Sequence, residues 1–210
     1  MKEAYRTVKS TATAEFTERR SRFIGVLQPV GSREEAQAFL DALRREHRDA
    51  RHVCFAYRVG DAAKFSDDGE PTGTAGQPLM QILERNELSD CVLAVVRYFG
   101  GILLGAGGLL RAYSHTGALT ADAAETVTVR TCTLLEVTCD YPFYGIVRPL
   151  LEQQGVLTDS RFEEAVTLTA ALPPEAVQAV CDAVTEQSAG RFSARIVGER
   201  AIPFEETEKN

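Results

Sequence analysis

Residues 91–114 read CVLAVVRYFGGILLGAGGLLRAYS and predict, in order, a buried strand, a glycine-rich turn and a helix. Cys91–Val96 is an unbroken apolar run, which is typical of a central strand covered on both faces. Five glycines follow within the nine residues from Gly100 to Gly108, so we expect a loop over residues 99–105. A helix to about Ala124 follows this loop, so strand, turn and helix form the centre of a first domain.

A second glycine-rich stretch, SDDGEPTGTAG at residues 66–76, lies between a short strand and a helix. Its Asp-Gly pair, its proline and its closely spaced glycines are typical of turns. Thr74 or Gly76 can begin a helix over Gln77–Arg85, with a proline accommodated in the first turn. We expect the two glycine-rich loops to form one working surface.

The residues around these loops predict further strands and one more helix. Ser32, followed three residues later by Glu35, is a capping box that predicts the start of a helix. Strands are indicated within residues 5–30, most clearly at Arg22–Leu27, and again at His52–Val59 and Ala63–Ser66.

Beyond Glu125 the pattern becomes β-α-β-β-α-β, the order of a ferredoxin-like domain. The predicted strands are Val127–Cys139, Val156–Phe162, Glu164–Leu172 and Phe192–Ile202, and the predicted helices are Pro142–Gln154 and Pro173–Ala189. We therefore predict an α+β protein of two domains, residues 1–126 and 127–204, with a disordered tail at residues 205–210.

Charge is unevenly distributed along the chain of 210 residues, whose net charge is −7. Up to Glu125 there are 16 basic and 17 acidic residues, and beyond it there are 7 and 13. This excludes a uniformly basic nucleic-acid-binding protein but leaves room for a basic patch in the first domain. No apolar run is long enough to cross a membrane and no secretory signal is visible, so we expect a cytoplasmic protein without membrane association.

The glycine-rich run before the long helix is a candidate anion site. Backbone N–H groups at a helix start bind anions, and Arg97 and Arg111 would add charge-assisted hydrogen bonds. Tight packing of helix on sheet explains the same glycines equally well, and the spacing matches neither a phosphate loop nor a dinucleotide-binding motif. Tyr98 could stack on a nucleic-acid base. Anion binding and packing therefore stay open for this run.

Asp67, Asp68 and Glu70 place three carboxylates within four residues. They could hold Mg²⁺ or Ca²⁺, but the EF-hand pattern is absent. We favour carboxylates that accept hydrogen bonds from loop N–H groups or from Arg97 and Arg111. The sequence therefore predicts no metal and no cofactor.

The cysteines and Ser114 are not part of the sequence motifs in which such residues usually act as nucleophiles. Five cysteines without a CxxC pair favour buried thiols over a disulfide frame, a zinc site or a nucleophile. Ser114 precedes a histidine but is not part of a GxSxG motif. We assign no catalytic residue and lean towards a protein that is not an enzyme.

The two stretches SDDGEPTGTAGQPLMQIL and VVRYFGGILLGAGGLLRAYS together resemble the YigZ/IMPACT family, as do Ser21–Gly25 and Asp49–His52. The resemblance covers the whole chain and implies a first domain similar to domain IV of elongation factor G and to the second domain of a small-subunit ribosomal protein. It implies a second domain similar to domain V of elongation factor G. Eukaryotic members regulate translation under amino-acid starvation, through a kinase pathway that bacteria lack.

The resemblance also implies a binding site, because the family motif falls on both glycine-rich stretches. The candidate ligand, anion or nucleic-acid-binding residues are His52, Asp67, Asp68, Glu70, Thr74, Arg97, Tyr98, Gly100, Gly101, Gly105, Gly107, Gly108, Arg111 and Ser114. Gln77 departs from the family, whose members often carry a basic residue there, and so removes one phosphate contact.

Three functions are open at this point. The first is a monomeric, non-catalytic protein that binds RNA or a ribosome-associated partner and acts in the regulation of translation. The second is an enzyme for a phosphorylated or anionic small molecule, with Asp67, Asp68 and Glu70 holding a metal or serving as base. The third is a protein-interaction module in which the acidic second domain meets a basic partner.

Overall fold

The computed structural model describes residues 4–204, and the predicted tail at 205–210 lies outside them. The chain divides into two compact units, Tyr5–Thr128 and Val129–Phe204. The described part contains two five-stranded sheets and five α-helices, which confirms the predicted α+β class. Within it, no helix combines the length and hydropathy needed to cross a bilayer.

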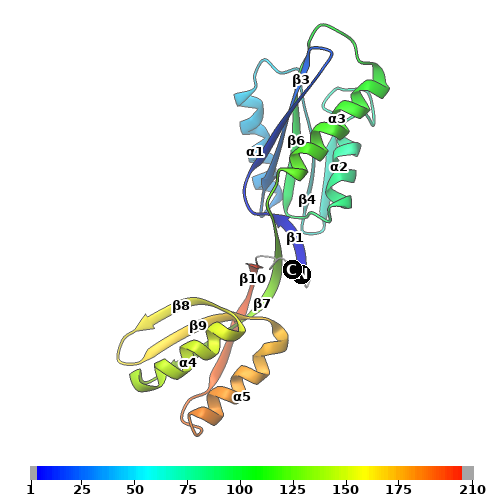
Figure 1. Ribbon diagram of the computed structural model, residues 1–210. Helices are drawn as coiled ribbons and strands as arrows, with labels where there is room; N and C mark the ends of the chain where they lie inside the picture. Colours follow the sequence, from blue (N-terminus) through cyan, green and yellow to red (C-terminus); the bar gives the residue numbers. More distant parts are fainter. Residues whose placement is uncertain (1–3, 205–210) are drawn as a thin grey trace. The chain divides into compact units, whose positions relative to one another are not determined.

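The first unit is built on an antiparallel sheet with β6 at its centre. The strands are β2 (Ala12–Glu18), β3 (Ser21–Pro29), β4 (His52–Val59), β5 (Ala62–Ser66) and β6 (Cys91–Tyr98), in the order β2-β3-β6-β4-β5. Figure 1 shows helix α1 (Arg33–Glu46) on one side of this sheet and helices α2 (Gly76–Arg85) and α3 (Gly105–Asp122) on the other.

Strand β6 is covered on both faces, as its apolar run predicts. Val92, Ala94 and Val96 belong to the core beneath α1, whereas Leu93 and Val95 belong to the core beneath α2 and α3. Successive side chains of a strand point to opposite faces, so a central strand between two helical layers must be apolar at every position.

Glycines allow unusually close approach at two places in this unit. A Cβ added at Gly76, the first residue of α2, would lie 2.7 Å from the carbonyl oxygen of Ser66. A Cβ at Gly100 would overlap the backbone of Arg20 and Ser21. The packing interpretation of the glycines therefore holds at Gly100, whereas Gly101 and Gly105 face open space with φ values of +83° and +69°.

The helix starts follow local capping rules only in part. The Ser32 hydroxyl accepts from the Glu35 N–H, as a capping box requires, but the Glu35 carboxylate accepts from the N–H of Gly31. Helix α2 begins at Gly76, which is one of the two starts that the sequence predicts, and the preceding Ala75 has no polar side chain to cap it.

The second unit has the predicted β-α-β-β-α-β element order. Its elements are β7 (Thr126–Cys139), α4 (Tyr141–Gln154), β8 (Val156–Phe162), β9 (Val166–Leu172), the 3-10 turn η1 (Pro174–Ala176), α5 (Val177–Gln187) and β10 (Ala194–Phe204). The sheet runs β10-β7-β9-β8, and β1 (Ala4–Val8) also pairs with β7. Helices α4 and α5 cover one face over a core that includes Leu135, Val147 and Val184.

Candidate functional site

A buried ion pair joins the two glycine-rich stretches. The Arg97 Nη1 donates to Glu70 Oε1 at 2.6 Å, and only 7% of the arginine side chain and 3% of the glutamate side chain are exposed. Tyr113 of α3 donates its hydroxyl to the same oxygen at 2.9 Å. Burial raises the pKa of Tyr113 far above its ordinary value, so this hydroxyl stays a donor. One carboxylate thus links a loop, the central strand and the long helix.

Asp67 shapes the loop between β5 and α2. Its carboxylate accepts from the N–H groups of Gly73, Ala75 and Gly76 at 2.8–2.9 Å. Burial alone would raise the pKa of Asp67, but these backbone donors outweigh that effect and lower it. The Asp67 carboxylate is therefore an internal cap for the start of α2, in agreement with the prediction that loop N–H groups bind it.

Asp68 ties the same loop to the strand and helix on its other side. Its side chain accepts from Arg44 Nη2 at 3.0 Å and from the Val53 N–H at 2.7 Å. Its carbonyl oxygen accepts from His52 Nδ1 at 2.7 Å, which places the proton of that ring on Nδ1. The Nε2 of His52 then lies 3.9 Å from Glu70 Oε1, close enough for an ion pair when the ring is charged.

The remaining contacts of Arg97 are also internal. Its Nη2 donates to the Ser21 hydroxyl at 3.4 Å, and its guanidinium carbon lies 5.5 Å from the Phe23 ring and 5.6 Å from the Phe99 ring. Its Nε is buried without a hydrogen-bond partner in the described residues. Arg97 therefore holds the base of the loop in place, and both of its Nη groups are engaged by the protein itself.

Cys54 belongs to the same buried network. Its thiol donates to the Asp67 carbonyl at 3.0 Å and lies 3.4 Å from the Tyr113 hydroxyl. Burial raises the pKa of Cys54 to about 12, and the Tyr113 contact opposes that rise only in part. A thiol that is protonated at neutral pH is a poor nucleophile, so the buried-thiol interpretation holds for this cysteine.

The candidate residues do not all face the same way. Tyr98 follows Arg97 on β6, packs on the α1 side of the sheet, and its hydroxyl lies 2.8 Å from His47 Nδ1. Arg97 points to the opposite side, towards Tyr113. The structure therefore separates Tyr98 from the α3 residues Arg111 and Ser114.

The outer face of the glycine-rich loop is exposed and carries cations and apolar groups. We define the loop surface as Arg20, Arg51, Phe99, Leu103 and Arg111. Leu103 is 81% exposed and Phe99 is 40% exposed. The Arg51 guanidinium lies over the Phe99 ring at 5.6 Å, and the backbone of Arg20 lies against Gly100. Among residues 4–204, none of the three arginines has a carboxylate partner.

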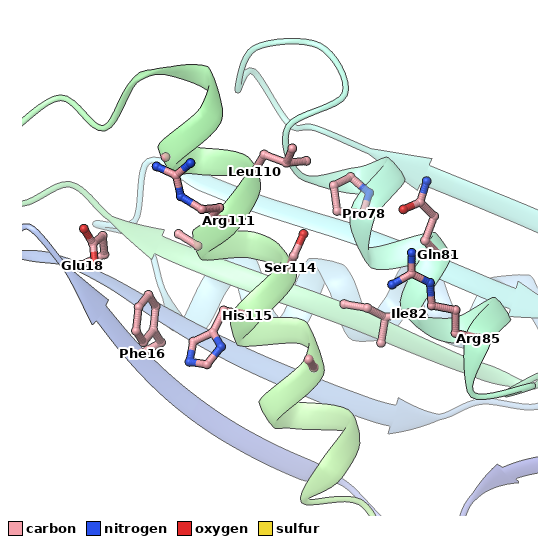
Figure 2. A pocket seen from close by; sticks show the side chains of 13 residues that line it. Phe16, Glu18, Pro78, Gln81, Ile82, Arg85, Leu110, Arg111, Ser114 and His115 are labelled. Carbon is pink, nitrogen blue, oxygen red and sulfur yellow. The ribbon is translucent and has the colours of Figure 1, made fainter.

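The other candidate residues fall into three groups. Thr74 is buried, and its hydroxyl donates to the Pro71 carbonyl at 2.7 Å. Gly107 is exposed and Gly108 partly exposed in the first turn of α3. Arg111 and Ser114 line a hollow of about 770 Å³ over α3, bordered by α2 and by β2 (Figure 2).

The acidic segment forms no metal site in the described residues. No group of three His, Cys, Asp or Glu side chains there has the arrangement to hold an ion. Each carboxylate of the segment is instead engaged by donors from the protein itself, as the contacts above show. Arg111 is not one of these donors, so the expectation that it would share the carboxylates with Arg97 finds no contact in the structure.

Fold and site together define a two-domain α+β protein whose first domain is organised by paired glycine-rich stretches around a buried Glu–Arg pair. An Impact N-terminal domain model matches residues 19–120, and a domain of unknown function (DUF1949) matches residues 137–191. An IMPACT family member of Haemophilus influenzae is 35% identical over 199 residues, which cover 92% of this chain and 97% of that protein. This chain belongs to the IMPACT family.

Further similar proteins also match most of the chain. IMPACT family member YigZ of Escherichia coli is 40% identical over 163 residues, covering 74% of this chain and 79% of that protein. A crystal structure described as that of a hypothetical protein matches with a TM-score of 0.65 and 32% identity. It covers 95% of this chain and 100% of that one.

Several members of the site escaped the sequence-based reasoning. Ser21, Arg44 and Cys54 all contact the acidic loop or Arg97, although they lie far from them in sequence. The antiparallel pairing that sets His52 opposite Arg97 brings the acidic loop to β6. Local spacing carries no signal for such contacts, whereas the predicted pairing of the two motifs was a correct indication of the Glu70–Arg97 link.

Proposed function

We propose that this IMPACT family member is a non-catalytic protein that binds RNA, in association with the ribosome, and so acts in translation. The contact would be made by the loop surface of the first unit. One observation carries this proposal: Glu70 and Arg97 form a buried ion pair and Asp67 accepts from N–H groups of its own loop, whereas Arg20, Arg51 and Arg111 have no carboxylate partner within residues 4–204.

The chemistry of the loop surface suits a single-stranded or looped RNA. Exposed guanidinium groups bind phosphate, often through two parallel hydrogen bonds. Phe99 adds a partly exposed ring on which a base can stack. The first N–H groups of α3 have no side-chain cap in the described chain, and α3 has no acidic residue in its first turn, so its start favours an anion.

The family resemblance implies a likeness of the two units to domains IV and V of elongation factor G, which act on the ribosome. We take this expected likeness as support for the same proposal. The acidic second unit, with six more acidic than basic residues beyond Glu125, is a poor partner for phosphate and would orient the first unit.

The test is fluorescence anisotropy with a labelled single-stranded RNA and the full chain, titrated at several salt concentrations. Arg97 is not a suitable target because its replacement would disturb the fold. The variant Arg20→Gln/Arg51→Gln instead removes two exposed charges. We expect weaker binding and a log–log salt slope smaller by about 0.7 for each phosphate contact removed.

The matched control is Arg33→Gln/Arg45→Gln, which makes the same charge change on α1. This variant should bind RNA like the parent protein. Equal losses of RNA affinity in the two variants would show that the loss comes from overall charge and not from the loop surface. Unchanged binding in Arg20→Gln/Arg51→Gln would overturn the proposal.

A further inference from the structure

The loop between β6 and α3 carries an apolar tip that lies outside the core of the first unit. Leu103 is 81% exposed, the largest value among the exposed large apolar side chains of the described residues, and Ile102 beside it is 40% exposed. Phe99, at the start of the same loop, is exposed as well. Single exposed leucines are ordinary on protein surfaces, but three large apolar side chains on one short loop mark a contact site.

Backbone contacts fix the base of this loop. The antiparallel register of β3 against β6 pairs Arg22 with Tyr98, so the turn between β2 and β3 lies beside the first residues of the loop. The Gly100 N–H donates to the Ser21 hydroxyl at 3.3 Å, and a Cβ at Gly100 would overlap the backbone of Arg20. Figure 1 shows this turn and the loop at the same end of the sheet. The apolar tip therefore projects from an anchored base.

The sheet order places a cation on each side of the apolar tip. Strands β3 and β4 flank β6 and run antiparallel to it, so the residues that precede them lie on either side of the loop that follows β6. Arg20 precedes β3, and Arg51 precedes β4 with its guanidinium 5.6 Å from the Phe99 ring. The tip is thus an apolar projection between two arginines.

Turn stability does not account for the arginine on the β3 side. Arg19 and Arg20 form the two-residue turn between β2 and β3, with φ values of +44° and +67°. A turn with positive φ at both positions favours asparagine and glycine, and side chains such as arginine add strain there. Such strain is common at binding sites, which agrees with a contact made by this turn.

The small size of the apolar tip distinguishes between the partners that it could contact. A stable interface with another protein buries about 800 Å² on each side, far more than one or two side chains supply. Nucleic-acid-binding proteins, in contrast, insert single leucine or isoleucine side chains between neighbouring bases. Cations beside such a wedge contact the flanking phosphates. Leu103 and Ile102, with an arginine on each side, match this second arrangement.

We propose that Leu103 and Ile102 form a wedge that enters an interruption in an RNA helix, such as a bulged nucleotide. This inference rests on the proposed function and narrows the RNA to a helix that contains an unpaired nucleotide. At an unpaired position the stack is already weakened, so the wedge need not separate paired bases. Arg20 and Arg51 would contact phosphates on the two sides of the interruption.

The test is fluorescence anisotropy of the full chain with two RNA duplexes that differ only by one bulged nucleotide, at one salt concentration. We expect the bulged duplex to bind about tenfold more tightly than the paired duplex, because unstacking a paired step is costly. Leu103→Ser should remove this preference but keep the salt slope of the remaining binding, which depends on charge. The control Ile196→Ser alters a side chain that is 61% exposed in the second unit, and should keep the preference.

A second measurement reports on the wedge itself. The fluorescence of a 2-aminopurine placed beside the bulge should rise when the parent protein binds, because the wedge unstacks that base. It should not rise with Leu103→Ser, whereas Ile196→Ser should behave like the parent. Thermal melting of each variant checks that the fold is retained.

The outcomes separate the wedge from the RNA proposal. Equal affinity of the parent for the two duplexes, or an unchanged preference in Leu103→Ser, would overturn the wedge. The RNA proposal would still stand if Arg20→Gln/Arg51→Gln weakened binding to single-stranded RNA. Binding to vesicles of anionic lipid that Leu103→Ser abolishes, without any preference for the bulged duplex, would overturn the wedge and assign the tip to a membrane surface.

Discussion

At the residue scale, one buried carboxylate contributes strongly to the stability of the first unit. Glu70 neutralises Arg97 and accepts from Tyr113 while almost fully buried. The variant Glu70→Gln leaves the guanidinium buried without a counter-charge. Breaking a buried pair in this way costs about 3–5 kcal/mol, so urea unfolding should show a loss of that order.

The matched control for this change is Glu152→Gln, which breaks the exposed Arg148–Glu152 pair within α4. Exposed pairs contribute little, so its unfolding midpoint should stay close to that of the parent. Similar losses in the two variants would show that the buried pair has no special role.

Asp67 makes the stability of the same unit depend on pH. Its folded-state pKa is lowered, below an unfolded value of about 3.9, by the N–H donors of its loop. The resulting stabilisation is present above the unfolded pKa and is lost as the pH falls through the folded pKa. Asp67→Asn should therefore lower the free energy of unfolding at pH 7, and the gap to the parent should narrow below about pH 4.

Chemical unfolding of both proteins at a series of pH values measures this gap. Asp61→Asn, in the exposed turn between β4 and β5, serves as the control and should show no such gap. A difference between Asp67→Asn and the parent that stays constant from pH 7 to pH 3 would contradict the role given to this carboxylate.

At the element scale, the glycine-rich loop contains glycines of different kinds. Gly100 lies against the backbone of Arg20, which cannot move aside as a side chain could. A Cβ added at Gly107, in the first turn of α3, would lie an ordinary 3.8 Å from the Arg111 side chain. Gly100→Ala should therefore destabilise the protein by about 1–3 kcal/mol.

Gly107→Ala should be neutral or stabilising by up to about 1 kcal/mol, because alanine favours the helix over glycine. Thermal melting of the two variants compares them directly. Equal changes in stability at the two positions would contradict the view that Gly100 in particular is needed for the close approach of β3 to the loop.

Elements were predictable where local pattern fixes them, and contacts were not. The apolar run of β6, the Ser32 capping box and the glycines before α3 each carry a local signal, and the structure has a strand or helix at each. The opposite orientations of Arg97 and Tyr98 follow from strand alternation. The bond from Arg44 to Asp68 depends on how α1 lies relative to the acidic loop, which no short-range pattern records.

At the scale of the whole molecule, the two units differ in charge and in the tasks that we propose for them. The first unit carries the loop surface and the hollow over α3, and the second unit is acidic and has its helices on one face of its sheet. The proposed contact of RNA with the loop surface can be measured by hydrogen–deuterium exchange of the full chain, with and without RNA.

Bound RNA should slow exchange at the amides of residues 101–107 and at Arg51, and leave strands β8 and β9 of the second unit unchanged. Protection confined to the second unit, or no protection at residues 101–107 at a saturating RNA concentration, would contradict the claim.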